Sequence, residues 1–253
     1  MTRERSPEPL VKAVAAAAGL SRRKAFAAVR AGRVRVGGVA VTDPSAPYQG
    51  GDVELDGRKL QPAGDKVYLL MNKPAGVITT VTDTHGRPTV LDLVPVELRL
   101  PGLHPAGRLD RDTTGLLVLT NDGDLTYRLT HPSHEVDKEY WLRSSPPLTE
   151  QALQRLRRGV ELDGRVRRPL DAGRLPPESG YETTVTLREG RKRQVRRMVE
   201  ALGARVTALK RVREGSLRLG DLPEGAVRRL TEDEVQALRG GRLRPGRGGA
   251  ARP

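Results

Sequence analysis

The sequence predicts an α+β protein with a small N-terminal domain and a larger domain built on a mixed, largely antiparallel sheet with flanking helices. The 253 residues suffice for one small and one larger domain. Beyond residue 66, several short segments alternate apolar and polar residues, which is typical of antiparallel strands with one solvated face. Segments with helix-capping residues lie among these strands, as expected for an α+β fold.

The first domain is predicted over residues 8–64 and begins with two helices. Leu10–Ala18 is rich in alanine, and Gly19 is placed to end this helix. Ser21 can cap a second helix over Arg22–Ala31, because its hydroxyl can accept a hydrogen bond from an amide of the first turn.

Short strands are predicted next. Val34–Val36 and Val39–Val41 alternate on either side of Gly37-Gly38, a pattern that predicts a tight hairpin. The alternating stretch Asp52–Asp56 predicts a further strand.

The charge of this domain indicates a polyanionic partner. The chain has 45 Lys and Arg against 31 Asp and Glu, a net charge of +14. Residues 21–42 include six basic and no acidic side chains. A solvated helix face normally mixes both signs, so we interpret the segment as a surface for a nucleic-acid backbone. The residues predicted to make these contacts are Arg22, Arg23, Lys24, Arg33 and Arg35.

This domain resembles the α-L RNA-binding domain of a small-subunit ribosomal protein, tyrosyl-tRNA synthetases and several RNA-modifying enzymes. The resemblance rests on Gly19-Leu-Ser-Arg-Arg-Lys24, Ala31-Gly-Arg-Val34 and Val36-Gly-Gly-Val39. The chain departs from the pattern before Lys12, where Pro9-Leu10-Val11 replaces the usual Arg-Leu, so one backbone contact is expected to be missing.

The second domain is predicted over residues 66–238, after a Pro/Gly-containing linker. The predicted strands are Val67–Met71, Val77–Thr82, Leu116–Thr120, Glu139–Leu142, Glu182–Leu187 and Val206–Val212. The predicted helices are Glu150–Arg158, Gln194–Leu202 and one that starts at the capping box Thr231–Glu234. Residues 239–253 are rich in Arg and Gly and are predicted to be a disordered tail.

Composition excludes several classes of protein. Without cysteine, the chain has no disulfide, thiolate zinc site or iron–sulfur cluster. No apolar run is long enough to span a membrane, and no signal peptide is recognisable, so we expect a cytoplasmic protein. Aromatic residues make up only 3% of the chain, so we expect no aromatic platform for stacking bases.

The segment from Ala106 to Leu125 is the most informative for chemistry. A polar loop leads into the apolar strand Leu116–Thr120, and loops at the ends of buried strands are where catalytic groups are best positioned. From the residues alone, Asp110 and Asp112 are both candidates, and nothing ranks one above the other.

The same segment resembles the signature of pseudouridine synthases. The matching residues are Gly107-Arg-Leu-Asp110 and Thr113-Thr-Gly-Leu-Leu117. Thr120-Asn-Asp-Gly-Asp-Leu125 resembles the branch (RsuA/RluB type) that modifies bacterial ribosomal RNA at single sites. Further matching blocks are Asn72-Lys-Pro74 with Gly76, Gly86–Val90, Leu129–Ser133, Lys138–Tyr140 and Glu189–Met198.

The resemblance implies a site. Asp110 would be the essential carboxylate, acting either as a nucleophile or by removing the ribose 2′ proton, and the sequence does not choose between these routes. Arg196 would pair with Asp110, Tyr140 would stack on the uracil, and Arg108 would fill the space of the everted nucleotide. Further residues predicted to contact RNA are Lys73, Arg191, Lys192, Arg193 and Arg197.

The resemblance also implies partners, and two alternatives stay open. We expect ribosomal RNA, most simply large-subunit RNA in a ribosome-assembly intermediate, bound by a monomer that needs neither metal nor cofactor. One alternative is a noncatalytic RNA-binding or ribosome-assembly factor. The other is a metal-dependent RNA phosphodiesterase that uses Asp110, Asp112, Asp122 and Asp124.

Overall fold

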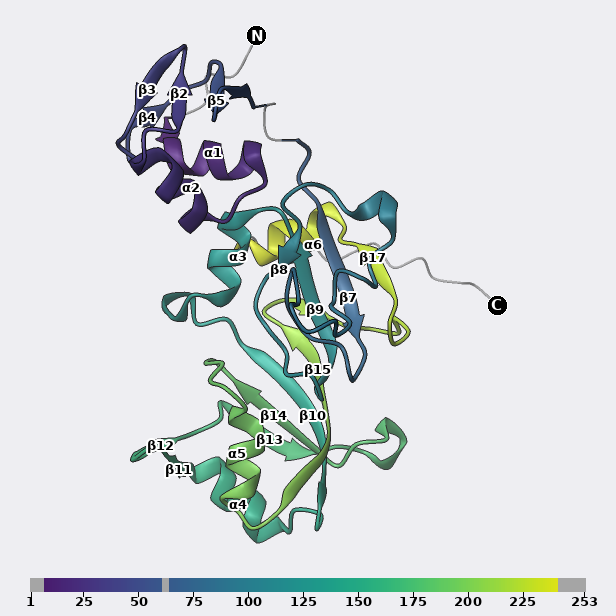
Figure 1. The fold of residues 1–253 in the computed structure, drawn as a ribbon. Helices are drawn as coiled ribbons and strands as arrows, with labels where there is room; N and C mark the ends of the chain where they lie inside the picture. The colour runs from purple at the N-terminus through teal and green to yellow at the C-terminus, as the bar shows by residue number, and fades with distance from the viewer. Residues whose placement is uncertain (1–6, 61–63, 241–253) are drawn as a thin grey trace. The chain divides into compact units, whose positions relative to one another are not determined.

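A computed structural model describes residues 7–60 and 64–240 and divides the chain into two compact units. The first unit ends at Val67 and also includes Glu97–Leu103. The second contains Tyr68–Val96 and the chain from His104 onward. Figure 1 shows the two units along the chain.

The first unit packs two helices against small sheets. Its helices are α1 (Leu10–Ala18) and α2 (Arg22–Arg30). Its strands are β1 (Glu8–Pro9), β2 (Val34–Val36), β3 (Val39–Val41), β4 (Pro47–Tyr48), β5 (Val53–Leu55) and β6 (Arg58–Lys59). The order β3-β2-β5-β6 forms one antiparallel sheet, and β1 pairs with β4.

The predicted helices and hairpin of this unit are confirmed. Gly19 ends α1 in the left-handed conformation that glycine tolerates best, with φ +62°. Ser21 caps α2 by accepting a hydrogen bond from the Lys24 amide. The hairpin pairs Val36 with Val39, as the Gly-Gly turn predicts.

The second unit is built on one nine-stranded sheet. The order is β13-β14-β10-β15-β9-β7-β17, with β16 added to β15 and β8 to β9. Its strands are β7 (Tyr68–Lys73), β8 (His104–Pro105), β9 (Thr114–Thr120), β10 (Lys138–Ser145), β13 (Asp171–Arg174), β14 (Thr183–Leu187), β15 (Arg205–Glu214), β16 (Leu217–Arg218) and β17 (Val227–Arg229). A separate hairpin joins β11 (Val160–Leu162) to β12 (Arg165–Arg167).

Helices cover both ends of this sheet. Helix α4 (Glu150–Arg158) packs against β13 and α5 (Gln194–Glu200) against β15, whereas α3 (Gly123–Thr130) packs against β9 and α6 (Glu232–Leu238) against β16 (Figure 1). Three 3-10 turns complete the described elements: η1 (Val96–Leu98), η2 (Pro132–His134) and η3 (Pro177–Ser179). The α+β prediction is confirmed, and the sheet is antiparallel except where β15 runs parallel to β9.

Two sequence predictions need correction. Val77–Thr82 is not a strand: only Ile78 forms a bridge, to Thr89, and the rest of the segment is a loop. The predicted tail begins too early, because Arg239 bonds to Asp122 at 2.7 Å and covers the Tyr68 ring. Residues 241–253 of that tail lie outside the described residues.

None of the helices in residues 7–60 and 64–240 combines the length and apolar character needed to cross a membrane.

Gly115 allows the parallel pair at the centre of the sheet. It has φ +103°, and a Cβ there would lie 2.2 Å from the carbonyl oxygen of Arg211 on β15. The two backbones therefore approach each other at a distance that only glycine permits.

We predict that Gly115→Ala lowers the free energy of unfolding by at least about 2 kcal/mol, because the strands must separate and the backbone is strained. Gly203→Ala is the control, since Gly203 also has a positive φ but open space around its Cβ position. Urea unfolding of both variants measures the difference. Equal destabilisation of the two would contradict a role for close strand contact.

Candidate active site

Asp110 lies in the loop between β8 and β9, before the first residue of β9. The Thr113 amide donates to the Asp110 carbonyl at 3.0 Å, which closes a turn. Asp110 is half-buried, whereas its neighbour Leu109 packs inward with 6% exposure. The loop thus buries an apolar anchor and leaves the carboxylate within reach of solvent.

The backbone on both sides of Asp110 is held by the segment that follows β7. The Thr79 hydroxyl donates to the Leu109 carbonyl at 2.9 Å and lies 3.3 Å from the Leu109 amide. The Gly76 amide donates to the Arg111 carbonyl at 2.8 Å, and the Arg111 side chain returns a bond to the Gly76 carbonyl. These bonds fix the residues immediately before and after the carboxylate.

Lys73 supplies the third support, from inside the protein. Its side chain is fully buried, and Nζ donates to the carbonyls of Pro74 at 2.8 Å, Arg111 at 3.3 Å and Thr113 at 3.0 Å. The predicted contact of Lys73 with RNA is therefore wrong, because its buried ammonium donates to three backbone carbonyls instead. Burial lowers the pKa of Lys73 to about 8, an effect that the nearby Asp112 and Asp110 carboxylates oppose.

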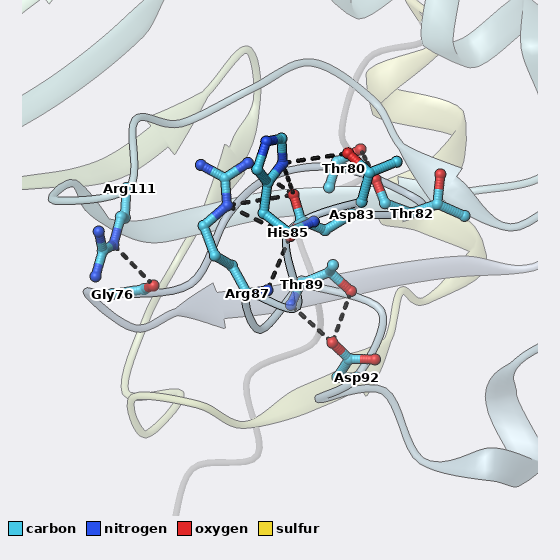
Figure 2. Close-up of polar contacts among 10 residues, drawn as sticks. Gly76, Thr80, Thr82, Asp83, His85, Arg87, Thr89, Asp92 and Arg111 are labelled. Atoms are coloured by element: carbon cyan, nitrogen blue, oxygen red, sulfur yellow. Dashed lines mark hydrogen bonds and ion pairs between the residues drawn. The ribbon is translucent and has the colours of Figure 1, made fainter.

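The loop after Thr79 is itself ordered by a carboxylate (Figure 2). Asp83 accepts from the amides of His85 at 2.9 Å and Arg87 at 2.8 Å, and from the Arg87 guanidinium at 2.7 Å. At the end of the loop, the Thr89 amide and hydroxyl both donate to Asp92. The loop therefore holds its shape through local bonds while it supports the Asp110 turn.

Tyr140 lies on β10 beside a buried ion pair. Tyr140 is 9% exposed, and Arg211 lies close enough to influence its hydroxyl. Arg211 donates to the Leu116 carbonyl at 2.8 Å and pairs with the fully buried Glu214 at 3.2 Å. Burial raises the pKa of Tyr140, while Arg211 opposes the rise, so the hydroxyl stays protonated at neutral pH.

Arg211 and Glu214 were not found by sequence reasoning. Arg211 lies on the predicted strand Val206–Val212, and Glu214 lies two residues beyond it; charged residues of a strand are usually taken to face solvent. One signal was available for Arg211, which follows the buried Leu209 by two residues. Glu214 does not follow that alternation, because β15 has a register shift against β10 between Arg211 and Arg213.

Arg196 is at the start of α5, but it does not pair with Asp110 as predicted. Its guanidinium donates to the Asp112 carbonyl at 2.9 Å and forms an ion pair with the Asp112 carboxylate at 3.2 Å. The turn closed by Thr113 directs both the carbonyl and the carboxylate of Asp112 toward α5. Arg196 therefore pairs with Asp112 and not with Asp110. Arg196 is 4% exposed, and its Nε has no hydrogen-bond partner among the described residues.

The Asp110 carboxylate still acts electrostatically on the Arg196 guanidinium. Burial lowers the pKa of Arg196, and the carboxylates of Asp112 and Asp110 counter that effect. Asp110 also contributes to the raised pKa of Tyr140. The structure therefore brings Asp110, Tyr140 and Arg196 within electrostatic reach of one another.

Several of the basic residues predicted to contact RNA form ion pairs with carboxylates of the same chain. Arg33 bonds to Asp56 at 2.7 Å, and Asp112 also accepts an ion pair from Arg193 at 3.3 Å. The remaining pairs are Arg191 with Glu189 and Arg197 with Asp163. Arg22, Arg23, Lys24, Arg35, Arg108 and Lys192 are exposed, and so are the paired Arg33, Arg191 and Arg193.

The four carboxylates of the phosphodiesterase hypothesis do not form one site. Asp110 and Asp112 precede β9, whereas Asp122 and Asp124 follow it. Seven strand residues span roughly 20 Å, too far for shared coordination of one metal ion. The Asp122 carboxylate also accepts hydrogen bonds from Tyr68, from Arg239 and, as the cap of α3, from the Asp124 amide.

The fold and this site correspond to a known class of RNA-modifying enzyme. The family described as RNA pseudouridylate synthase matches residues 67–201, and the S4 domain family matches residues 8–54. The chain therefore belongs to the pseudouridine synthases and carries an N-terminal S4 domain. Membership in this enzyme family removes the main support for a noncatalytic factor.

Individual relatives agree over nearly the whole chain. It is 40% identical to the ribosomal large subunit pseudouridine synthase B of Bacillus subtilis, covering 92% of this chain and 96% of the relative. The protein of that name from Vibrio cholerae is 39% identical, covering 92% of this chain and 74% of the relative. A crystal structure of a pseudouridylate synthase matches with a TM-score of 0.63 at 33% identity, covering 91% of this chain and 99% of that structure.

We predict that Lys73→Met lowers the free energy of unfolding by about 2 kcal/mol, because buried carbonyls lose their donor while the side chain keeps its length. Lys192→Met is the control, since Lys192 is exposed. Thermal unfolding compares the two with the parent protein. The supporting role of Lys73 is wrong if both variants melt like the parent.

We also predict a pH-dependent cost for Asp83→Asn. The Arg87 guanidinium and two backbone amides hold the pKa of Asp83 well below its ordinary value of 3.8. The carboxylate therefore contributes its full stability above pH 4 and loses it as the pH falls below 4. Melting curves should show a gap between parent and Asp83→Asn at pH 7 that narrows at pH 3. A gap that widens on acidification would refute this assignment.

Proposed function

We propose that this chain converts a uridine of large-subunit ribosomal RNA to pseudouridine, with Asp110 as the catalytic carboxylate. One observation carries the assignment of Asp110. Its carboxylate is half-exposed on a turn whose backbone is fixed from both sides, and it acts electrostatically on both Tyr140 and Arg196. A preorganised carboxylate of this kind suits chemistry at a sugar.

The choice of RNA rests on the relatives and on charge. Two relatives that match over nearly the whole chain are named for the large ribosomal subunit. The net charge of +14 and the exposed basic side chains of α2 favour a structured polyanion. Both considerations support ribosomal RNA as the substrate.

The proposed reaction exchanges one bond of the nucleoside for another. The bond from ribose C1′ to uracil N1 breaks, the base turns, and C1′ bonds to C5; the C5 proton is lost and N1 gains a proton. The Asp110 carboxylate either attacks the sugar or takes the 2′ proton, and both routes require it to be ionised.

Tyr140 and Arg108 would serve the everted nucleotide. A paired base must leave the helix before an enzyme can reach its glycosidic bond. The buried Tyr140 ring offers a face for the uracil, and its contact with Arg211 reduces the cost of losing the hydroxyl proton. Arg108 is exposed two residues before Asp110, where it can fill the space that the base leaves.

We further propose that the chain works as a monomer on an assembly intermediate of the ribosome. Asp110, Tyr140 and Arg196 all come from one chain, so a second copy is not needed to complete the site. Before assembly is complete, a target uridine can still be everted.

We predict that Asp110→Asn reduces pseudouridine formation in large-subunit RNA by at least about 1,000-fold, because the amide neither attacks nor accepts a proton. Asp221→Asn is the control, since Asp221 is exposed in a loop of the same unit. Nucleoside analysis of unmodified transcripts before and after incubation measures the product. Unimpaired product formation by Asp110→Asn, or shortening of the RNA by the parent protein, would overturn the proposal.

A further inference from the structure

Three ring side chains gather on the surface at the end of α3. The ring centroids of Tyr127 and His131 are 4.5 Å apart, and those of Tyr127 and His134 are 5.2 Å apart. Tyr127 is 48% exposed, and both histidines are exposed. We call Tyr127, His131 and His134 the ring cluster. The ring cluster lies outside the hydrophobic core, so core packing does not explain why these rings gather.

The ring cluster has a rigid support. The preceding residues Leu125 and Leu129 of α3 are buried in the main hydrophobic core. His131 ends α3 and caps η2, where its ring nitrogen accepts from the Ser133 amide. The rings are therefore held in place before any partner arrives, which reduces the entropic cost of binding.

The ring cluster borders the Asp110 loop. A Cβ at Gly107 would lie 3.5 Å from Cγ2 of Thr130, so Gly107 lies beside the Thr130 side chain. Thr130 precedes His131 directly, and Gly107 precedes the exposed Arg108. A nucleotide next to the one that enters the Asp110 site therefore passes near these rings.

We propose that the ring cluster stacks on an unpaired base of the substrate RNA next to the everted uridine; this inference rests on the proposed function. Flat, exposed rings bind the faces of bases without regard to sequence, whereas paired bases offer no free face. The proposal departs from the expectation, drawn from the 3% aromatic content, that the chain has no aromatic platform for stacking bases. Two histidines supply the rings that a count of Phe, Trp and Tyr omits.

The chemistry of the site favours RNA over a protein partner. Thr130, next to the ring cluster in the chain, lies beside Gly107, which precedes the exposed Arg108. The chain as a whole carries a charge of +14. A protein interface would instead be expected to centre on a larger continuous apolar patch.

Binding is measured with unmodified large-subunit ribosomal RNA transcripts and full-length protein in the Asp110→Asn background, which prevents turnover. Tyr127→Leu keeps an apolar side chain that can pack on the helix but removes the ring, and we expect it to weaken binding about 10-fold. Tyr127→Phe should bind within about 2-fold of the parent, because it keeps the ring face.

Two further variants control for folding and for exposed apolar area. His134→Ala removes a ring that caps no helix, and it should also weaken binding. Leu170→Ala removes an apolar side chain that is exposed to the same extent as Tyr127, at 48%, and should not change binding. The melting temperature of each variant shows whether lost affinity reflects lost folding.

The outcomes separate this inference from the proposed function. Equal affinity of the parent, Tyr127→Leu and His134→Ala for the transcripts would overturn stacking. So would a defect that is seen only on ribosomal precursor particles, because it would assign the rings to a protein partner. In contrast, failure of the wild-type protein to form any pseudouridine in the same transcripts would overturn the proposed function itself.

Discussion

The buried ammonium of Lys73 is the constraint on which the candidate active site depends. A charged group without solvent must find hydrogen-bond acceptors, and here the acceptors are backbone carbonyls on both sides of a turn. The turn is therefore fixed by the need to satisfy a buried cation. Lys73 bonds to backbone carbonyls around Asp110 and not to its carboxylate, which leaves that carboxylate for substrate.

A second buried cation organises the other wall of the site. Arg211 occupies the point where β15, β10 and β9 meet: it pairs with Glu214, donates to a carbonyl of β9 and acts on the Tyr140 hydroxyl of β10. Gly115 makes this meeting possible by letting two backbones approach closely. Breaking such a buried pair leaves an uncompensated charge, so the arrangement resists single substitutions.

Local patterns predicted much of the fold, and long-range contacts account for what they missed. Gly19, Ser21 and the Gly37-Gly38 turn act on adjacent residues, so the first unit was predictable. Val77–Thr82 has the composition of a strand, but Thr79 bonds to the Asp110 loop instead of a ladder. Resemblance nominated Asp110, Tyr140 and Arg196. The exchange of Asp110 for Asp112 as the partner of Arg196 depended on a turn geometry that no sequence pattern specifies.

The central claim is that the Asp110 turn is formed before RNA binds. Hydrogen–deuterium exchange of the protein without RNA tests it most directly at the Gly76 amide, which donates to the Arg111 carbonyl, and at the Thr113 amide, which donates to the Asp110 carbonyl. We expect both amides to exchange far more slowly than an unstructured peptide, and added RNA to protect them little further. Fast exchange that RNA suppresses would show instead that the turn forms only on binding.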